Sequence, residues 1–208
     1  MFLTRKNLII RYKFTLDFRA HMQQKTQYYT KTAQWIHWIM AIIFIGAWLI
    51  GFYSGNFLSY EVDGSFKGTV ITLHKNIATV IIFLVILRIF WRYTHPVPQL
   101  PNSMSAMMKV MAHLGHLVLY LLLLALPITG CLYSWSAGHP APVLYLFEIP
   151  RLVQDNPELL AIVKPIHVYL SWFAGFVIVG HVLMALKHHF IDKDHVLKSM
   201  VGQDKTSH

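Results

Sequence analysis

Four long apolar runs dominate the sequence and restrict the folds that are open to it. They occupy residues 33–53, 70–91, 111–133 and 164–187, and none of them contains an aspartate or a glutamate. A helix rises about 1.5 Å per residue, so about 20 residues cross the hydrocarbon core of a bilayer, which is about 30 Å thick. Each run is therefore long enough to span a membrane. The sequence predicts an all-α membrane protein, a four-transmembrane-helix bundle.

The composition agrees with this prediction. Of the 208 residues, 55% are hydrophobic and 13% are charged, and the mean hydropathy is +0.47. A soluble domain usually carries about 25% charged residues. The net charge of +9 could suggest nucleic-acid binding, but the basic residues lie in the N-terminal tail and in short connections beside the apolar runs. Membrane orientation explains this placement better, so we exclude nucleic acid as a partner.

The lysines and arginines also predict the direction of the chain, because cytoplasmic connections are enriched in them. With the N-terminus inside, the outer side holds Lys67, Lys75, Arg151 and Lys164. The inner side then holds Arg5, Lys6, Arg11, Lys13, Arg19, Lys25, Lys31, Arg88, Arg92, Lys109, Lys187, Lys193, Lys198 and Lys205. We therefore predict that both termini are cytoplasmic.

The chain divides into one domain and two tails. We predict a cytoplasmic N-terminal tail over residues 1–30, a transmembrane domain over 31–191 and a cytoplasmic C-terminal tail over 192–208. The N-terminal tail lacks the apolar core and cleavage site of a signal peptide. A second methionine, Met22, suggests that residues 1–21 come from an over-called start. The single cysteine, Cys131, excludes an intrachain disulfide and a covalent c-type haem, and we expect it to pack in the apolar interior.

Histidines occur in every apolar run, and their depths form a pattern. His167 and His181 lie 14 residues apart in the last run, so they face the same side of a bundle helix at depths about 21 Å apart. His74 lies at the outer depth of His167, whereas His37, His113 and His116 lie near the inner depth of His181.

One partner at each depth would give two bis-histidine sites. Two imidazole ligands in an apolar slot are what a non-covalent b-type haem requires, and the facing helices of a bundle can supply them. Spacing alone pairs His74 with His167, but it leaves the inner partner of His181 open between His37 and His116.

Several segments resemble the bacterial di-haem cytochrome b561 family. They are "AQWIHW", "TLHKNIA…RIFWR", "MAHLGHLVLYLLLLALPITG" and "IHVYLSWFAGFVIVGHVLMALKHHFIDKD", and together the likeness covers roughly residues 30–200. The resemblance implies a bundle holding two b haems in the bacterial inner membrane, with ubiquinone as redox partner. The family's first ligand is the histidine of a His-Trp pair. This assigns the inner haem iron to His37 and His181, and the outer one to His74 and His167.

The resemblance also implies a function. We expect a di-haem b membrane electron-transfer protein that exchanges electrons between the ubiquinone pool and a one-electron partner, with superoxide as a candidate donor. No catalytic residue is assigned. The alternative is a haem b anchor subunit of a hydrogenase-like or formate-dehydrogenase-like complex, which would dock a soluble redox partner. A metalloprotease is excluded because no His-Glu-x-x-His motif occurs, and the acid-free spans argue against a proton-coupled transporter.

The remaining polar residues in and beside the apolar runs could have a role at the haems or a purely structural role. His113 and His116 are expected near the inner haem, as propionate contacts, a proton path or part of a quinone pocket. Arg88, Arg92 and Lys75 are candidates for haem propionates, and equally for side chains that reach the membrane surface. We expect solvated histidines at the end of the last run and in the loops: His188, His189, His95, His139, His195 and His208.

Overall fold

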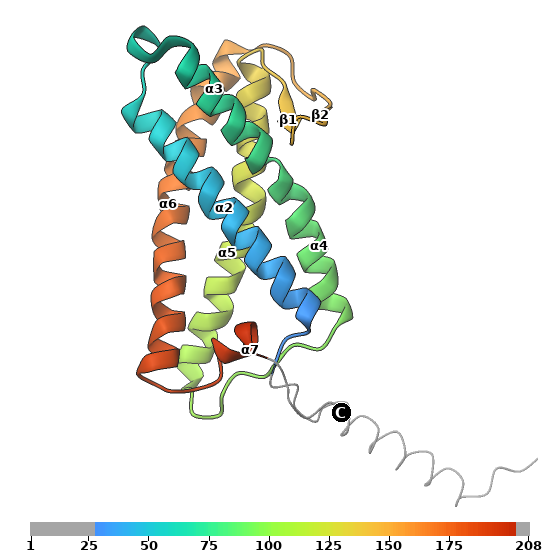
Figure 1. Cartoon of the computed structure of the whole chain (residues 1–208), viewed down its shortest axis with the longest axis vertical. Coiled ribbons are helices and arrows are strands. Elements are labelled where there is room, and N and C mark those ends of the chain that lie inside the picture. The colour runs from blue at the N-terminus through green and yellow to red at the C-terminus, as the bar shows by residue number, and fades with distance from the viewer. Residues whose placement is uncertain (1–27, 203–208) are drawn as a thin grey trace, which may run out of the picture.

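The computed structural model describes residues 28–202, so the proposed start at Met22 lies outside the described residues. Four long helical segments form an elongated bundle (Figure 1). They are α2 (Lys31–Phe57), α3 with α4 (Tyr60–Ala78 and Val80–Thr94), α5 (Ala106–Ser136) and α6 (Pro157–Phe190). All four are long and apolar enough to cross a membrane. The predicted four-helix membrane fold is confirmed.

Short polar residues start the long helices. The side chains of Thr30, Ser105 and Asn156 accept hydrogen bonds from backbone amides of the first turns of α2, α5 and α6, at 3.2, 3.2 and 2.9 Å. Such caps satisfy amides that have no partner within the helix. The helices extend beyond the apolar runs. Most of the connection expected over residues 54–69 is helical, with a kink at Gly64 (φ 44°).

The second helical segment is broken, although the sequence there predicts one continuous run over 70–91. α3 ends at Ala78 and α4 begins at Val80, with Thr79 between them. No proline or glycine lies at this point, and Thr79 keeps helical angles (φ −64°, ψ −25°). The Thr79 hydroxyl donates to the carbonyl of Lys75 at 3.0 Å within the helix, a bond that often bends helices, and groups from outside the helix also bond here. The backbone amide of Leu144 donates to the carbonyl of Asn76 at 3.1 Å, and the Thr79 hydroxyl donates to the carbonyl of Pro142 at 2.7 Å.

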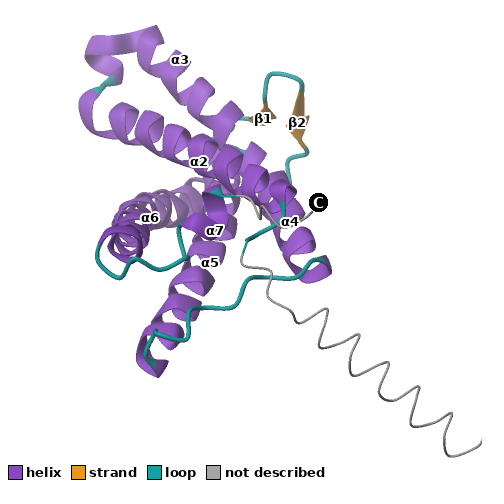
Figure 2. Ribbon diagram, turned by 60° about the horizontal axis from the view of Figure 1, so that its bottom comes forward, coloured by secondary structure: helices purple, strands orange, loops and turns teal. Residues whose placement is uncertain are grey.

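Those outside groups belong to a β-hairpin in the connection between α5 and α6. Its strands β1 (Ala141–Val143) and β2 (Phe147–Ile149) pair antiparallel beside the junction of α3 and α4 (Figure 2). The hairpin is a small addition to the all-α prediction. Ala141 packs with buried Cys131 and Trp135 of α5, so Cys131 has the packing role that the sequence predicts. We call this end of the bundle the hairpin end.

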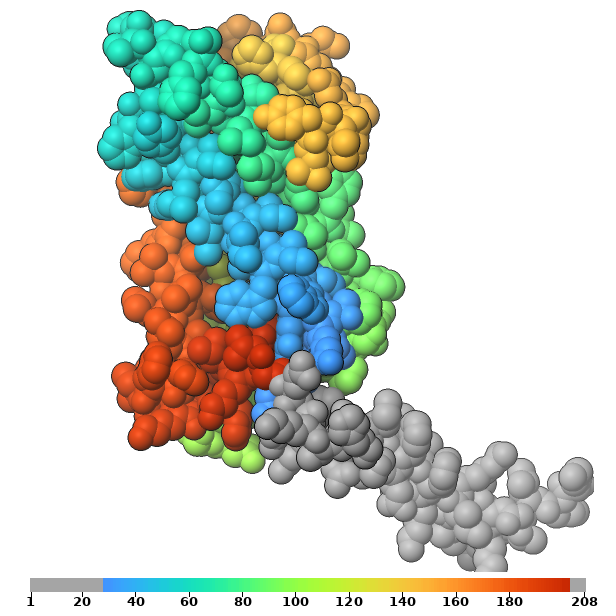
Figure 3. Space-filling view, viewed as in Figure 1, coloured from blue at the N-terminus to red at the C-terminus, as the bar shows by residue number. Residues whose placement is uncertain are grey.

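The opposite end is closed by the C-terminal segment, and we call it the α7 end. The short helix α7 (Lys198–Val201) returns to the start of α2 (Figure 3). The Gln34 amide donates to the carbonyls of Ser199 and Gly202 at 3.1 and 2.8 Å, and the Trp38 indole donates to the carbonyl of Met200 at 3.0 Å. The tail predicted from residue 192 is thus packed on the bundle as far as residue 202.

Apolar side chains occupy both the interior and the outer face. Small clusters such as Met40 with Ile81 and Val85 form the core between the helices. Large apolar residues on every helix also point outward, for example Ile42 at 70% and Phe176 at 76% exposure. A helix that is apolar on all sides is typical of a membrane span, where lipid covers the outward face.

Candidate functional site

The first predicted pair lies toward the hairpin end. His74 of α3 and His167 of α6 face each other with ring centroids 6.4 Å apart and ring planes at 74°. Both residues are half-buried. Two imidazoles on opposite sides of one metal, each with a nitrogen–metal distance of about 2 Å, have centroids about 6 Å apart. The separation therefore suits a shared metal ion.

Neighbouring groups fix the orientation of both rings. Nδ1 of His74 lies 2.8 Å from the carbonyl oxygen of Ala47, which can only accept, so Nδ1 is the donor. Nδ1 of His167 lies 3.0 Å from the hydroxyl of Thr129, and that hydroxyl itself donates to the carbonyl of Ala125 at 2.8 Å. On each ring Nε2 is then unprotonated, and its lone pair is free to bind a metal. Metal-binding histidines are usually held in this way through their other nitrogen.

Glycines make room for the two rings. A Cβ atom at Gly51 of α2 would lie 2.7 Å from Cε1 of His74, closer than packed atoms allow. A Cβ atom at Gly130 of α5 would lie 3.2 Å from Cε1 of His167. The close approach of α2 to His74 therefore requires glycine at position 51.

The second group lies toward the α7 end and contains three histidines. The ring centroids of His37 (α2) and His181 (α6) are 6.3 Å apart, with planes at 77°. His116 of α5 is also near His181, at 5.7 Å and 80°. Nδ1 of His116 donates to the carbonyl of Ala112 at 2.6 Å, whereas Nδ1 of His37 is buried and has no partner among the described residues. Proximity alone thus allows two pairings.

A cavity of about 550 Å³ adjoins these three histidines. Its walls are mainly apolar side chains of α2, α5 and α6, together with residues of the C-terminal segment and the guanidinium-bearing side chain of Arg88. An apolar slot with imidazoles and one cation suits a planar apolar group that carries anionic substituents, and a haem with its propionates is such a group.

The other residues predicted to contact the haems do not all lie at the two histidine groups. His113 is exposed and does not line the cavity, and Arg92 borders a smaller neighbouring pocket with Trp91 and His95. Lys75 is half-buried beside His74, and its side-chain ammonium has no hydrogen bond or ion pair within residues 28–202. The structure thus brings Arg88 to the cavity and leaves His113 and Arg92 outside it.

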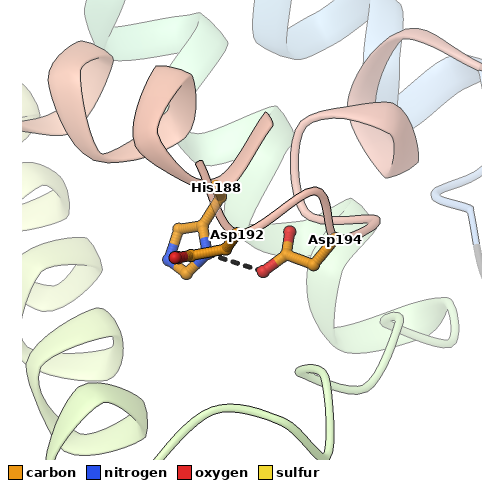
Figure 4. A group of neighbouring side chains, drawn as sticks. All are labelled: His188, Asp192 and Asp194. Atoms are coloured by element: carbon orange, nitrogen blue, oxygen red, sulfur yellow. Dashed lines mark hydrogen bonds and ion pairs between the residues drawn. The ribbon is translucent and has the colours of Figure 1, made fainter. Parts of the chain in front are cut away.

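The prediction of a solvated end is wrong for His188, which is 4% exposed (Figure 4). Its Nδ1 lies 2.6 Å from a carboxylate oxygen of Asp194 and 3.0 Å from one of Asp192. The chain turns after α6, with Lys193 at φ 53°, and brings both carboxylates back to the ring. Acidic residues four and six positions after the histidine were the available signal. Three ligand atoms lie close together here, but Lys187 already lies 2.6 Å from Asp192 and supplies the positive charge.

The remaining loop histidines differ in their environment. His139 and His195 are exposed, as predicted, and His208 lies outside the described residues. His95 is half-buried, with its ring stacked on that of Trp91 at a centroid distance of 3.8 Å. Position in a loop therefore predicted exposure for two of the three histidines that the structure describes.

Comparison with known proteins decides the family. A family model described as prokaryotic cytochrome b561 matches residues 28–203. The chain belongs to the prokaryotic cytochrome b561 family. It is 37% identical to cytochrome b561 homolog 2 of Escherichia coli K12 over 172 residues, which are 83% of this chain and 90% of that protein. It is 31% identical over 174 residues to the probable superoxide oxidase CybB of Yersinia pestis, covering 82% of this chain and 93% of that protein.

A third relative, cytochrome b561 homolog 1 of E. coli K12, is 28% identical over 183 residues, or 85% of this chain and 98% of that protein. Membership of the cytochrome b561 family makes this chain a multi-pass bacterial membrane protein that binds b-type haem and transfers electrons. The resemblance found in the sequence is confirmed.

Proposed function

We propose that this cytochrome b561 carries electrons across the membrane between ubiquinone and a one-electron partner, through two b haems stacked at different depths. The observation that supports it is the repetition of one geometry. His74–His167 and His37–His181 have centroid separations of 6.4 and 6.3 Å and similar ring angles. Their α6 members lie 14 residues apart, or about 21 Å along the helix.

The assignment of the haem at the α7 end rests on the family resemblance, in which the first ligand is the histidine of a His-Trp pair, here His37 beside Trp38. The centroid separations of His37 and His116 from His181, 6.3 and 5.7 Å, both suit a shared metal ion. We therefore assign His37 and His181 as axial ligands there, and His116 as a polar neighbour in the cavity wall. His113 is left out of the proposed site because it does not reach the cavity.

The residues of the chain bind, orient and shield the haems. A bound b haem supplies one-electron exchange at its iron. Ala47 and Thr129 hold the imidazoles of His74 and His167 with Nε2 free. We propose that Arg88 pairs with propionates at the α7 end and Lys75 at the hairpin end, while apolar helix faces keep water away.

Partner and orientation complete the proposal. We propose that the chain lies in the bacterial inner membrane with both termini in the cytoplasm, and the lysines and arginines that gather toward the α7 end support this orientation. Ubiquinone suits a carrier embedded in lipid, because it is itself dissolved there. Superoxide is proposed as the electron donor on the basis of the name of the Y. pestis relative.

The test of the ligand assignment is a count of haem per polypeptide in detergent-purified protein, with reduced-minus-oxidised spectra. The unsubstituted protein should hold two b haems. His74→Ala and His167→Ala should each lose one haem, and His37→Ala and His181→Ala the other, because each removes an axial ligand. His139→Ala, at an exposed loop position, is the matched control and should keep two. Two haems retained in all four ligand variants would overturn the assignment.

The superoxide donor is tested separately by stopped-flow spectroscopy. Oxidised protein mixed with excess superoxide should show haem reduction faster than spontaneous dismutation removes the donor, and added ubiquinone should then reoxidise the haems. Reduction that is abolished by superoxide dismutase would identify the donor. If haem reduction does not exceed the background rate while the haem count is two, superoxide is the wrong donor and the electron-carrier proposal stands.

A further inference from the structure

The β-hairpin between α5 and α6 contacts the bundle at an unexpected depth. Its partners are Asn76, Thr79 and Phe83, and the ring of Phe83 lies 6.2 Å from that of Phe147. All three partners belong to the apolar run over residues 70–91 that crosses the membrane. A connection that lay wholly in the aqueous phase would touch only the ends of the helices. These contacts place the hairpin beside a membrane span.

The backbone amides of the hairpin tip donate to acceptors within the protein. The amides of Leu144 and Leu146 donate to the carbonyls of Asn76 and Val143 at 3.1 and 2.9 Å. The amide of Tyr145 donates to the side-chain oxygen of Asn76 at 2.6 Å. Non-helical backbone is tolerated at membrane depth only where such groups find protein partners. Asn76, 1% exposed, supplies two of the three acceptors.

The side chains of the tip are apolar and face outward. Leu144, Tyr145, Leu146 and Phe147 are 49, 67, 78 and 52% exposed. The sequence contains no charged residue from Pro140 to Phe147, and Glu148 is the next charge. A contiguous apolar patch of this kind in water would be a liability, whereas aromatic and apolar side chains are favourable where lipid tails meet the head groups.

We propose that the hairpin tip, residues 144–147, is inserted into the lipid of the leaflet at the hairpin end, and that Asn76 anchors it there. The occupant of the outward face is the acyl region of the bilayer, with Glu148 at its polar boundary. The hairpin bonds directly to the junction of α3 and α4, where the Leu144 amide takes the Asn76 carbonyl and the Thr79 hydroxyl donates to Pro142. It also fixes the helix one turn beyond His74. This proposal does not depend on the number of haems.

The direct test uses a spin label on a cysteine at position 146. Leu146→Cys and the control Gln154→Cys, an exposed position in the same connection, are made in a Cys131→Ala background and studied in lipid nanodiscs. The label at 146 should be relaxed more by oxygen, which concentrates in lipid, than by a water-soluble nickel chelate. The label at 154 should show the reverse. Equal nickel accessibility at the two positions would overturn the insertion.

A chemical measurement covers the case in which the label perturbs the tip. A membrane-impermeant maleimide should modify Gln154→Cys at least several-fold faster than Leu146→Cys in nanodiscs, and both equally after denaturation. Similar rates in nanodiscs would contradict the proposal.

Anchoring is tested by adding Asn76→Leu to the Leu146→Cys protein. The substitution removes the side-chain acceptor of the Tyr145 amide, which should loosen the tip, so nickel accessibility at 146 should rise several-fold. Asn56→Leu, at an exposed asparagine of α2, is the control and should change nothing. Unchanged haem absorption would show that the bundle remains folded. An unchanged label in the Asn76 variant would overturn the anchoring role.

Discussion

At the scale of single residues, the histidine sites depend on groups that are neither charged nor ligands. The carbonyl of Ala47 holds Nδ1 of His74, and the absence of a side chain at Gly51 lets α2 approach the same ring. Thr129 and Gly130 play the same two parts for His167. Each proposed ligand at this end is therefore fixed by one acceptor and one glycine.

Gly51→Ala should disturb the haem at the hairpin end alone. The added methyl would lie 2.7 Å from Cε1 of His74 and must displace the ring or separate α2 from α3. Overpacking of this kind costs about 1–3 kcal/mol. We expect lower haem occupancy or a shifted midpoint potential for one haem, measured by redox titration. Gly55→Ala, one turn along α2 with no atom within 4 Å of the new methyl, should behave as the unsubstituted protein. Equal behaviour of both variants would contradict this account.

At the scale of elements, contacts from distant parts of the chain change where helices bend and end. The hairpin bonds to the second span at Thr79, where α3 and α4 meet. After α6, a turn returns Asp194 to His188 and directs α7 toward α2. This closure carries residues 195–197, 199 and 200 to the wall of the cavity that adjoins His181.

Asp194→Ala should loosen the closure at the α7 end. It removes a 2.6 Å hydrogen bond between two side chains that are 6% and 8% exposed, and hydrogen bonds to charged groups contribute about 1.5–3 kcal/mol. We expect a lower midpoint for thermal loss of haem absorption and faster proteolysis after residue 190. Asp155→Ala is the control, since its side chain is 71% exposed. A thermal midpoint equal to that of the control would show that the pair does not hold the segment.

At the scale of the whole molecule, charge separates the two ends of the bundle. The described residues at the α7 end carry Lys31, Arg88, Arg92, Lys109, Lys187, Lys193 and Lys198, and the hairpin end carries Lys67, Lys75, Arg151 and Lys164. The acidic residues are divided the other way, with Glu61, Asp63, Glu148, Asp155 and Glu158 at the hairpin end and Asp192 and Asp194 at the α7 end. Because lysine and arginine are retained on the cytoplasmic side, this asymmetry predicts the orientation of the bundle.

Reporter fusions in a bacterial host test that orientation. A fluorescent protein fused after His208 should fold and fluoresce, and alkaline phosphatase at the same point should be inactive, because that enzyme needs an oxidising compartment. Alkaline phosphatase inserted at Gln154 of the α5–α6 connection should be active. The opposite pattern would mean that the hairpin end is cytoplasmic.

The sequence by itself determined the four spans, the depths of the histidines and the family. Apolar run length and helical rise are local properties, so they predict spans and place His167 and His181 at two depths on one face. The same reasoning left His181 with two candidate partners, and the structure indeed brings both His37 and His116 near it.

Only the tertiary structure decided the break at Thr79, the hairpin beside it and the burial of His188. Each depends on groups that meet through folding: Asn76 with Leu144, Thr79 with Pro142, and His188 with an aspartate beyond a turn. The run over residues 70–91 contains no proline or glycine that would mark the junction, and its hydrogen bonds to the hairpin come from a segment more than 60 positions away. Local periodicity holds no information about such contacts.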